Sequence, residues 1–256
     1  MATLSVVLAT YNEENNLPKC LESVKDLADE IVIVDGSSTD KTVEVAKKFG
    51  AKVVVTTNKP IFHINKQKAI DFATKDWILQ LDADERVSPQ LKNEIRHLTT
   101  VSDRGSQLNG YWIPRKNWFL GRFLMKGGQY PDYTLRLYRR GKGRLPQKSV
   151  HEQAVVEGKV GYLKNPLIHM ADLSFSRYLL RFDRYTSLIR DELQEQKIGY
   201  NPIIAIKYLA ALPISWFFLT YVRHKGFMDS WQGFVFSFFS ALRFSVGYIK
   251  YIKNHG

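Results

Sequence analysis

Three carboxylates lie within four residues at the end of an apolar run, where the segment LQLDADE contains Asp82, Asp84 and Glu85. On an extended backbone, the side chains of Asp82 and Asp84 point to the same side. Such a pair suits a hard divalent cation, Mg2+ or Mn2+, which takes one or two protein carboxylates together with oxygens of a substrate diphosphate. The alternative is a solvated turn, because D-x-D alone is a common pattern.

The segments around this cluster alternate between two periods over the first hundred residues. Short apolar, β-branched runs predict strands at 4–10, 30–36, 52–57 and 76–82. Helical patterns follow them at 17–24, 42–50 and 65–74, and again from Ser88, a candidate N-cap that precedes Pro89. This spacing predicts βαβ units, and therefore an α/β fold with a mostly parallel sheet flanked by helices.

Polar side chains follow these predicted strands. Thr10, Asn12 and Glu14 come after the first strand, and Asp35 ends the second. Right-handed crossovers bring the carboxyl ends of parallel strands to one edge, where open α/β sheets bind ligands. Neither a GxGxxG segment after the first strand nor a P-loop is present. A phosphate ligand would therefore need another counter-charge, which a metal ion could supply.

The charge of the chain is unevenly distributed. Residues 1–100 contain 13 Lys and Arg against 15 Asp and Glu, whereas residues 101–256 contain 24 against 10. A basic C-terminal part indicates an acidic partner or a solvated surface. No RNP-like, zinc-finger or helix-turn-helix pattern accompanies the charge, so we expect no nucleic acid and favour an anionic membrane surface.

Residues 202–253 contain two apolar runs that are rich in aromatic residues. Each run is of borderline length for a bilayer span, and Pro213 interrupts the first. We favour helices that lie in or dip into the membrane interface. Burial against the core or a second subunit and true membrane spanning remain the alternatives.

The single cysteine, Cys20, excludes an internal disulfide and fits a reducing compartment. It lies in a helical pattern, and we expect it to pack in the core. The first residues, MATLSVVLAT, are typical of a strand and not of a signal peptide.

The motifs TYNEENNL, IVDGSSTDKT, NKQKAIDFATKDW and LQLDADE resemble, in this order, those of glycosyltransferase family 2, whose members have the GT-A fold. The resemblance covers residues 5–89. Two later segments, GGQYPDYTLRLYRRG and SVHEQAVVEGKVGYLKNPLIHM, extend it. They resemble bacterial enzymes that add a β-linked glucose or a related sugar to the inner core of lipopolysaccharide.

The resemblance implies a nucleotide-sugar site at the predicted sheet edge. Thr10, Asn12 and Glu14 would line the nucleoside pocket, and Asp35 would accept a hydrogen bond from the base, in particular from uracil. Thr10 and Asn12 could instead be simple turn residues.

The resemblance also implies roles for the acidic cluster and a lysine. Asp82 would lie near the ribose and the metal, with Asp84 as the main metal ligand. Lys66 would face the diphosphate, or it could be a surface lysine of a helix.

Inverting sugar transfer needs a general base that takes the proton of the acceptor hydroxyl. The family pattern points to Asp132, with Pro131 in place of the usual glutamate. Glu152 is the second candidate, and the neighbouring His151 could reach the metal or the diphosphate. Alternatively, Asp132 only turns the chain after Pro131.

Three arginines, Arg136, Arg139 and Arg140, follow Asp132 closely. They could bind an acceptor phosphate, because a guanidinium suits bidentate phosphate contacts. They could equally be solvated strand residues.

We therefore expect three parts: a nucleotide-sugar-binding α/β half at residues 1–100, an acceptor-side catalytic half of the same domain at 101–172, and a membrane-associated helical region at 173–256. The resemblance implies a metal-dependent, inverting hexosyltransferase that uses a UDP-sugar, with UDP-glucose as first candidate. Its acceptor would be a lipopolysaccharide core or another lipid-linked glycan. It would act as a peripheral or monotopic protein at the cytoplasmic face of the inner membrane.

Two other functions remain open from the sequence. The enzyme could transfer sugar to a polyprenyl phosphate, which needs little base catalysis. The chain could also be a non-catalytic nucleotide-sugar-binding protein of the membrane surface. The sequence does not indicate an oligomeric state.

Overall fold

The computed structural model describes residues 2–59, 61–101, 107–147, 153–199 and 201–253 of the chain. The chain forms two compact units. The sheet unit comprises residues 1–115 and 132–169, and the helical unit comprises residues 116–131 and 170–256. The three parts expected above, with boundaries after residues 100 and 172, stay a prediction.

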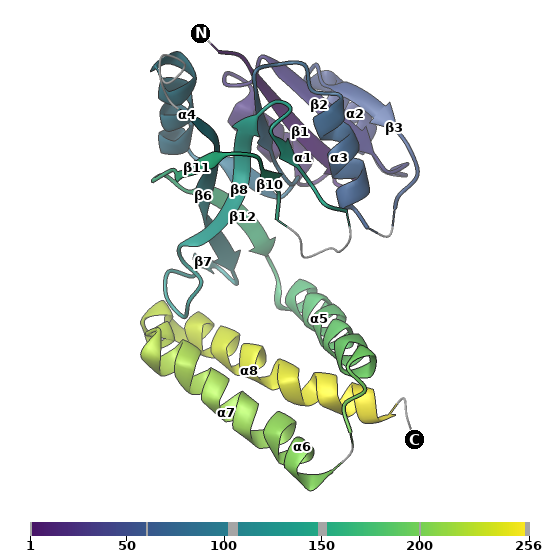
Figure 1. The fold of residues 1–256 in the computed structure, drawn as a ribbon, viewed down its shortest axis with the longest axis vertical. Coiled ribbons are helices and arrows are strands. Elements are labelled where there is room, and N and C mark those ends of the chain that lie inside the picture. The colour runs from purple at the N-terminus through teal and green to yellow at the C-terminus, as the bar shows by residue number, and fades with distance from the viewer. Residues whose placement is uncertain (1, 60, 102–106, 148–152, 200, 254–256) are drawn as a thin grey trace. The chain divides into compact units, whose positions relative to one another are not determined.

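A mixed sheet with the strand order β3-β2-β1-β4-β8-β6-β12-β5 is the centre of the sheet unit (Figure 1). The first four strands pair in parallel, and β8 pairs antiparallel with β4 and β6. The α/β class with a largely parallel sheet is thus confirmed. The strands on this path are β1 Leu4–Thr10, β2 Glu30–Asp35, β3 Lys52–Val55, β4 Trp77–Gln80, β5 Glu85–Val87, β6 Leu108–Phe119, β8 Asp132–Arg139 and β12 Leu167–Asp172.

Within the described residues, four shorter strands accompany them. β7 Arg122–Phe123 and β11 Lys159–Tyr162 pair with β6, antiparallel and parallel respectively. β9 Gly143–Arg144 and β10 Val155–Val156 form a separate antiparallel pair.

Helices cover both faces of the parallel strands, because β1 and β2 are apolar on both sides. One face packs against α1 Leu17–Val24, α2 Thr42–Lys48 and α4 Pro89–Val101, and the other against α3 His63–Asp71. Neighbouring residues of β1 illustrate the two layers, since Val6 belongs to the first core cluster and Val7 to the second. A strand that is buried on both faces is typical of a parallel sheet.

Local signals place the helix ends close to the predicted positions. The Ser88 hydroxyl accepts a hydrogen bond from the Leu91 amide at 3.2 Å, and Pro89 is the first residue of α4, where its missing amide hydrogen costs nothing. Gly50 follows α2 with φ +73°, a backbone conformation that glycine adopts without strain.

Cys20 lies in the core of the sheet unit with none of its surface exposed, as predicted. Burial raises the pKa of its thiol, and the nearby carboxylate of Glu85 adds to this effect. We expect native protein not to react with Ellman's reagent over an hour, and guanidinium-unfolded protein to react at once with one thiol per chain. Rapid reaction of native protein would contradict this placement.

In the helical unit, α5 Phe175–Glu195 precedes a helical hairpin. The first arm of the hairpin runs through α6 Pro202–Ile206, η1 Lys207–Ala211, α7 Leu212–Phe217 and η2 Phe218–Arg223. The short η3 Gly226–Asp229 leads into the second arm, α8 Ser230–Lys253. The π-helical turn η1 precedes Pro213, which has no amide hydrogen to donate and would crowd a regular α-helix.

The two arms are held together by aromatic and polar contacts. Tyr208 stacks on Tyr248 with ring centroids 5.1 Å apart, and the Trp216 indole donates to the Ser240 hydroxyl at 2.8 Å. At the tip, a Cβ atom on Gly233 would lie 1.9 Å from the carbonyl oxygen of Gly226. Only glycine permits this close approach of the two backbones.

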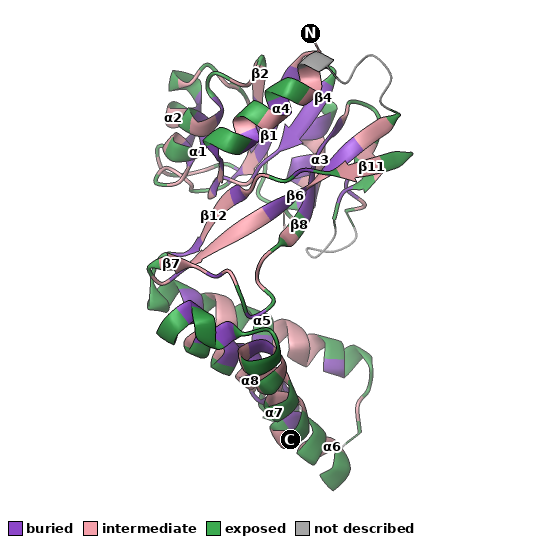
Figure 2. Ribbon diagram, turned by 90° about the vertical axis from the view of Figure 1, so that its left-hand side faces the viewer, coloured by how far each residue is buried: buried purple, intermediate pink, exposed green. Residues whose placement is uncertain are grey.

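Many apolar residues of the first arm are exposed, and Figure 2 colours much of this arm green for exposed residues. Ile206, Ile214 and Phe218 are 63%, 58% and 59% exposed. Residues 202–223 form a helix long and apolar enough to cross a membrane, with a mean hydropathy of 1.7 over its most apolar stretch, little of which is buried. Within the described residues, the hairpin therefore leaves an apolar face without a covering partner.

Candidate active site

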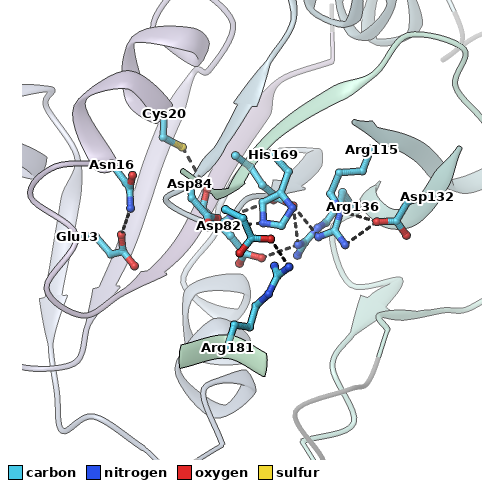
Figure 3. A network of polar contacts seen from close by, with 12 residues as sticks. Glu13, Asn16, Cys20, Asp82, Asp84, Arg115, Asp132, Arg136, His169 and Arg181 are labelled. Carbon is cyan, nitrogen blue, oxygen red and sulfur yellow. Dashed lines mark hydrogen bonds and ion pairs between the residues drawn. The ribbon is translucent and has the colours of Figure 1, made fainter. Parts of the chain in front are cut away.

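The acidic cluster at the end of β4 is neutralised by basic side chains from other elements of the sheet unit (Figure 3). The Lys66 ammonium, on α3, contacts one carboxylate oxygen of Asp82. A terminal nitrogen of the Arg136 guanidinium, on β8, lies 2.6 Å from the other Asp82 oxygen and 3.0 Å from Glu85 Oε1. Cations of the protein itself therefore lie between these acids, and the solvated-turn alternative is wrong for Asp82 and Glu85.

Arg115, near the middle of β6, extends these contacts to Asp132. Its Nε and Nη2 atoms both donate to Asp132 Oδ2, at 3.0 and 2.7 Å, and its Nη1 lies 3.4 Å from Glu85 Oε1. Positive and negative side chains thus alternate along a continuous path. We call this set the charge row: Lys66, Asp82, Arg136, Glu85, Arg115 and Asp132.

The pairing of the strands explains why these side chains meet. Arg115 lies directly opposite Asp132 in the antiparallel register of β6 and β8. The β4–β8 register pairs Leu79 with Leu137, so Arg136 comes next to the point where β4 ends and the acidic turn begins. The charge row is therefore a product of strand register and could not be recognised from local sequence.

Charge pairing shifts the pKa values along the row. Burial alone would raise the pKa of Asp82, but Arg136 and Lys66 outweigh it and hold that pKa well below its usual range. Burial alone would lower the pKa of the Arg136 guanidinium, but the negative charges of Asp82 and Glu85 outweigh this effect and raise that pKa. For the same reason Glu85 and Asp132 raise the pKa of Arg115. All three acids of the row therefore face permanently charged partners at neutral pH.

Asp84, the central acid of the motif, lies beside a histidine and outside the charge row. One carboxylate oxygen of Asp84 is 3.5 Å from His169 Nε2. The antiparallel pairing of β12 with β5 places His169 opposite Glu85 and so near Asp84. Carboxylate oxygens suit Mg2+ and Mn2+, and imidazole nitrogen is a common ligand of divalent transition metals.

The sequence predicted only one member of the pair formed by Asp84 and His169. Asp84 was the expected metal ligand, but His169 was not singled out, although it lies near the end of the quoted segment SVHEQAVVEGKVGYLKNPLIHM. The available signal was a histidine inside the apolar run LIHM. Among the residues that the structure describes, no group of three or more His, Cys, Asp and Glu is arranged around a common metal position. A cation here would therefore need further oxygens from a substrate, as is usual for Mg2+ beside phosphates.

The residues predicted for the nucleoside pocket form a network at the ends of β1 and β2. The Thr10 hydroxyl donates to Asp35 at 2.8 Å, across the register pair of the two strands. Asp35 is fully buried and also accepts from the amide and the hydroxyl of Ser38, both at 2.7 Å. Its carboxylate is therefore fixed in orientation by the protein.

The loop after β1 is held to the loop after β2. Asn12 has φ +54° and its side-chain oxygen accepts from the Thr39 amide at 2.9 Å. A carboxylate oxygen of Glu14 accepts from the Lys41 amide at 2.9 Å. All four predicted nucleoside residues therefore lie at one edge, and their contacts with a base or ribose stay predictions.

Two further predicted residues, His151 and Glu152, lie outside the described residues, so their predicted roles stay untested. The remaining arginines of the basic run differ in position. Arg136 belongs to the charge row, whereas the Arg139 guanidinium lies over the Trp77 ring at 4.7 Å. For Arg136, a solvated strand position is wrong, because its side chain is buried.

The chain resembles known proteins over nearly its whole length. Residues 5–153 match the model of the family described as glycosyl transferase family 2. The lipopolysaccharide core biosynthesis glycosyltransferase LpsC of Rhizobium meliloti is 31% identical over 259 residues, covering 94% of this chain and 91% of LpsC. An uncharacterized glycosyltransferase of Rickettsia typhi, RT0209, is 28% identical over 246 residues, covering 92% of this chain and 82% of its own.

A solved structure shares the fold. The mannosyltransferase PcManGT of Pyrobaculum calidifontis, determined in complex with GDP-Man and Mn2+, superposes with a TM-score of 0.58 at 13% identity. The match covers 100% of this chain and 88% of that one. The GT-A type of α/β fold expected from the motifs is thereby confirmed.

Proposed function

Because the chain belongs to glycosyltransferase family 2 and is a glycosyltransferase, we propose that it transfers a sugar with inversion from a UDP-sugar to a lipopolysaccharide core or another lipid-linked glycan. UDP-glucose is the first donor to test. The acceptor class is suggested by the relative LpsC, whose name assigns it to lipopolysaccharide core biosynthesis.

The donor would bind along the edge formed by the ends of β1, β2 and β4. Asp35 and its partners would hold the uracil end, and Lys66 and Arg136 would supply positive charge for the diphosphate. Asp84 and His169 would hold a divalent cation, in keeping with the Mn2+ bound to PcManGT. When bound, such a cation would neutralise the charge that develops on the leaving diphosphate.

Asp132 would act as the general base. The acceptor oxygen forms a bond to the anomeric carbon while the bond from that carbon to the diphosphate breaks, and Asp132 takes the acceptor proton. The single observation that carries the proposal is the charge row. Within the sheet unit, it joins Asp82, the acid predicted to lie near the sugar nucleotide, to Asp132, the predicted general base. Arg115 donates to Asp132 through two nitrogens and so fixes the orientation of its carboxylate.

The test is a transfer assay with purified full-length protein, radiolabelled UDP-glucose, Mn2+ and a truncated lipopolysaccharide acceptor. We expect labelled lipopolysaccharide whose new linkage is β. GDP-mannose and UDP-galactose in parallel reactions distinguish the donor. Absence of transfer from every UDP-sugar, with the acceptor present and the metal supplied, would contradict the proposal.

We further propose that the helical hairpin attaches the enzyme to the cytoplasmic face of the inner membrane as a peripheral or monotopic protein. Its exposed apolar face suits the acyl boundary, and Arg223 and Lys253 at the arm ends suit anionic headgroups. This location would bring the enzyme to a lipid-linked acceptor.

Changing Ile206, Ile214 and Phe218 together to serine should weaken binding to vesicles of anionic phospholipid by at least about tenfold, because three large apolar side chains lose their burial in lipid. Vesicle co-sedimentation measures the effect. The matched control changes three exposed apolar side chains of the sheet unit, Val55, Phe72 and Tyr162, to serine. Equal vesicle binding by both triple variants would exclude the hairpin as the attachment surface.

A further inference from the structure

Glu85 is the most deeply buried acid of the charge row, and no role in binding the donor or the acceptor has been assigned to it. Its side chain has 0% exposure, whereas those of Asp82 and Asp132 are 28% and 35% exposed. A fully buried carboxylate is costly unless cations and hydrogen bonds compensate for its lost hydration. Its contacts therefore indicate what it does.

Both oxygens of Glu85 are engaged, each with a different task. Oε1 faces two guanidinium groups, Arg136 at 3.0 Å and Arg115 at 3.4 Å. Oε2 accepts from the backbone amide of Asp82 at 2.9 Å, while the Glu85 amide donates to the Asp82 carbonyl at 2.9 Å. Glu85 thus closes the turn that carries Asp82 and Asp84, and at the same time it holds both arginines.

From this geometry we propose that Glu85 is a positioning residue, which keeps Arg136 directed at Asp82 and Arg115 directed at Asp132. The inference rests on the proposed function, since it assigns Asp82 to the donor side and Asp132 to base catalysis. Because its side chain is fully buried, Glu85 is not placed to touch a substrate. It acts through the two arginines, which are its neighbours along the row.

The physical reason lies in the charge balance of the row. Three acids alternate with three cations, and Glu85 is the acid shared by both arginines. Without the charge of Glu85, Arg136 would face only Asp82, and Arg115 would face only Asp132. Each buried guanidinium group would then pair more tightly with its remaining acid. A shifted Arg115 would turn the Asp132 carboxylate out of its position, and a shifted Arg136 would weaken the stabilisation of the charge that develops on the leaving diphosphate in the transition state.

Glu85→Gln tests this inference because the amide keeps the size and one acceptor but removes the charge. We expect kcat for transfer to fall by about ten- to a hundredfold, as misplacement of catalytic groups typically causes. The KM for the donor should change by less than about threefold, because the nucleoside network at Asp35 is untouched. A purely structural role would instead lower the melting temperature without this split between kcat and KM.

Glu94→Gln is the matched control. Glu94, on α4, is also an acid that fastens a loop, accepting from the amides of Lys164 and Asn165 at 3.0 and 2.9 Å, but it contacts no residue of the charge row. This variant should keep the wild-type kcat. If Glu85→Gln does not fold, Glu85→Asp is used instead, because it keeps the negative charge. It should retain more activity than Arg115→Gln, which removes the contact between Arg115 and Glu85.

The double variant Glu85→Gln with Arg115→Gln completes the test. Both changes interrupt the same chain of contacts in the charge row. The double variant should therefore lose little more transfer activity than the less active of the two single variants. Losses that multiply, or an unchanged kcat for Glu85→Gln in active protein, would overturn the positioning role alone. A wild-type protein that transfers no sugar from any UDP-sugar would overturn the proposed function, and this inference with it.

Discussion

Replacing Asp84 with alanine is expected to lower the rate of sugar transfer by at least about a hundredfold while leaving the fold intact. The reason is that Asp84 and His169 would be the two protein ligands of the divalent cation, which contributes several kcal/mol of stabilisation to a leaving diphosphate, and each 1.36 kcal/mol corresponds to tenfold in rate. Transfer assays over a range of Mn2+ concentrations measure the loss.

Binding measurements separate this role from a general disturbance of the site. Calorimetry should show that Mn2+ strengthens binding of UDP to the wild type and not to Asp84→Ala. His169→Ala should show the same defect in a milder form, since the negatively charged ligand Asp84 remains. The surface variant Asp26→Ala, whose side chain is 73% exposed, should behave like the wild type. Full Mn2+-dependent turnover by Asp84→Ala would exclude the metal site at this position.

Replacing Asp132 with asparagine is expected to lower kcat for transfer to a sugar hydroxyl by roughly 10²–10⁴-fold, the usual contribution of a general base. Asparagine keeps the size of the side chain and one acceptor for Arg115, but it cannot take a proton. Affinity for UDP and Mn2+ should remain that of the wild type, because Asp132 lies at the opposite end of the charge row from Lys66. Pre-steady-state transfer and calorimetry on the same preparation measure the two quantities.

Two other results for Asp132→Asn have definite meanings. Undiminished transfer to a polyprenyl phosphate would identify that acceptor, because a phosphate oxygen needs no proton removed. Undiminished transfer to a glycan would reject Asp132 as the base and move the role to the second candidate, Glu152. Glu152→Gln is therefore measured alongside.

The first hundred residues could be predicted well because their signals are local. The strand at 4–10 and the helix at 17–24 have the bounds predicted for them, since runs of β-branched residues and a regular apolar period need no distant partner. Ser88 and Gly50 mark helix ends through their own backbone and side-chain chemistry. The gathering of Thr10, Asp35 and Asp82 near one edge follows from parallel strands and right-handed crossovers.

The partners of the acidic cluster could not be predicted in the same way. Arg136 is separated from Asp82 by 54 residues, and Arg115 from Glu85 by 30. Their contacts depend on the register of antiparallel strands, and a slip of one residue would turn each side chain to the other face of the sheet. His169 was missed for the same reason, because only the pairing of β12 with β5 brings it to Asp84.

By itself, then, the sequence determined the α/β class, the order of elements and the acids that could do chemistry, because periodicity, caps and motif composition are properties of neighbouring residues. Tertiary structure alone decided which acids are neutralised by arginine, which one lies beside a histidine, and which apolar side chains of the hairpin stay exposed. These outcomes depend on strand register and helix packing, where contacts between distant residues compete and the lowest free energy of the whole chain selects among them.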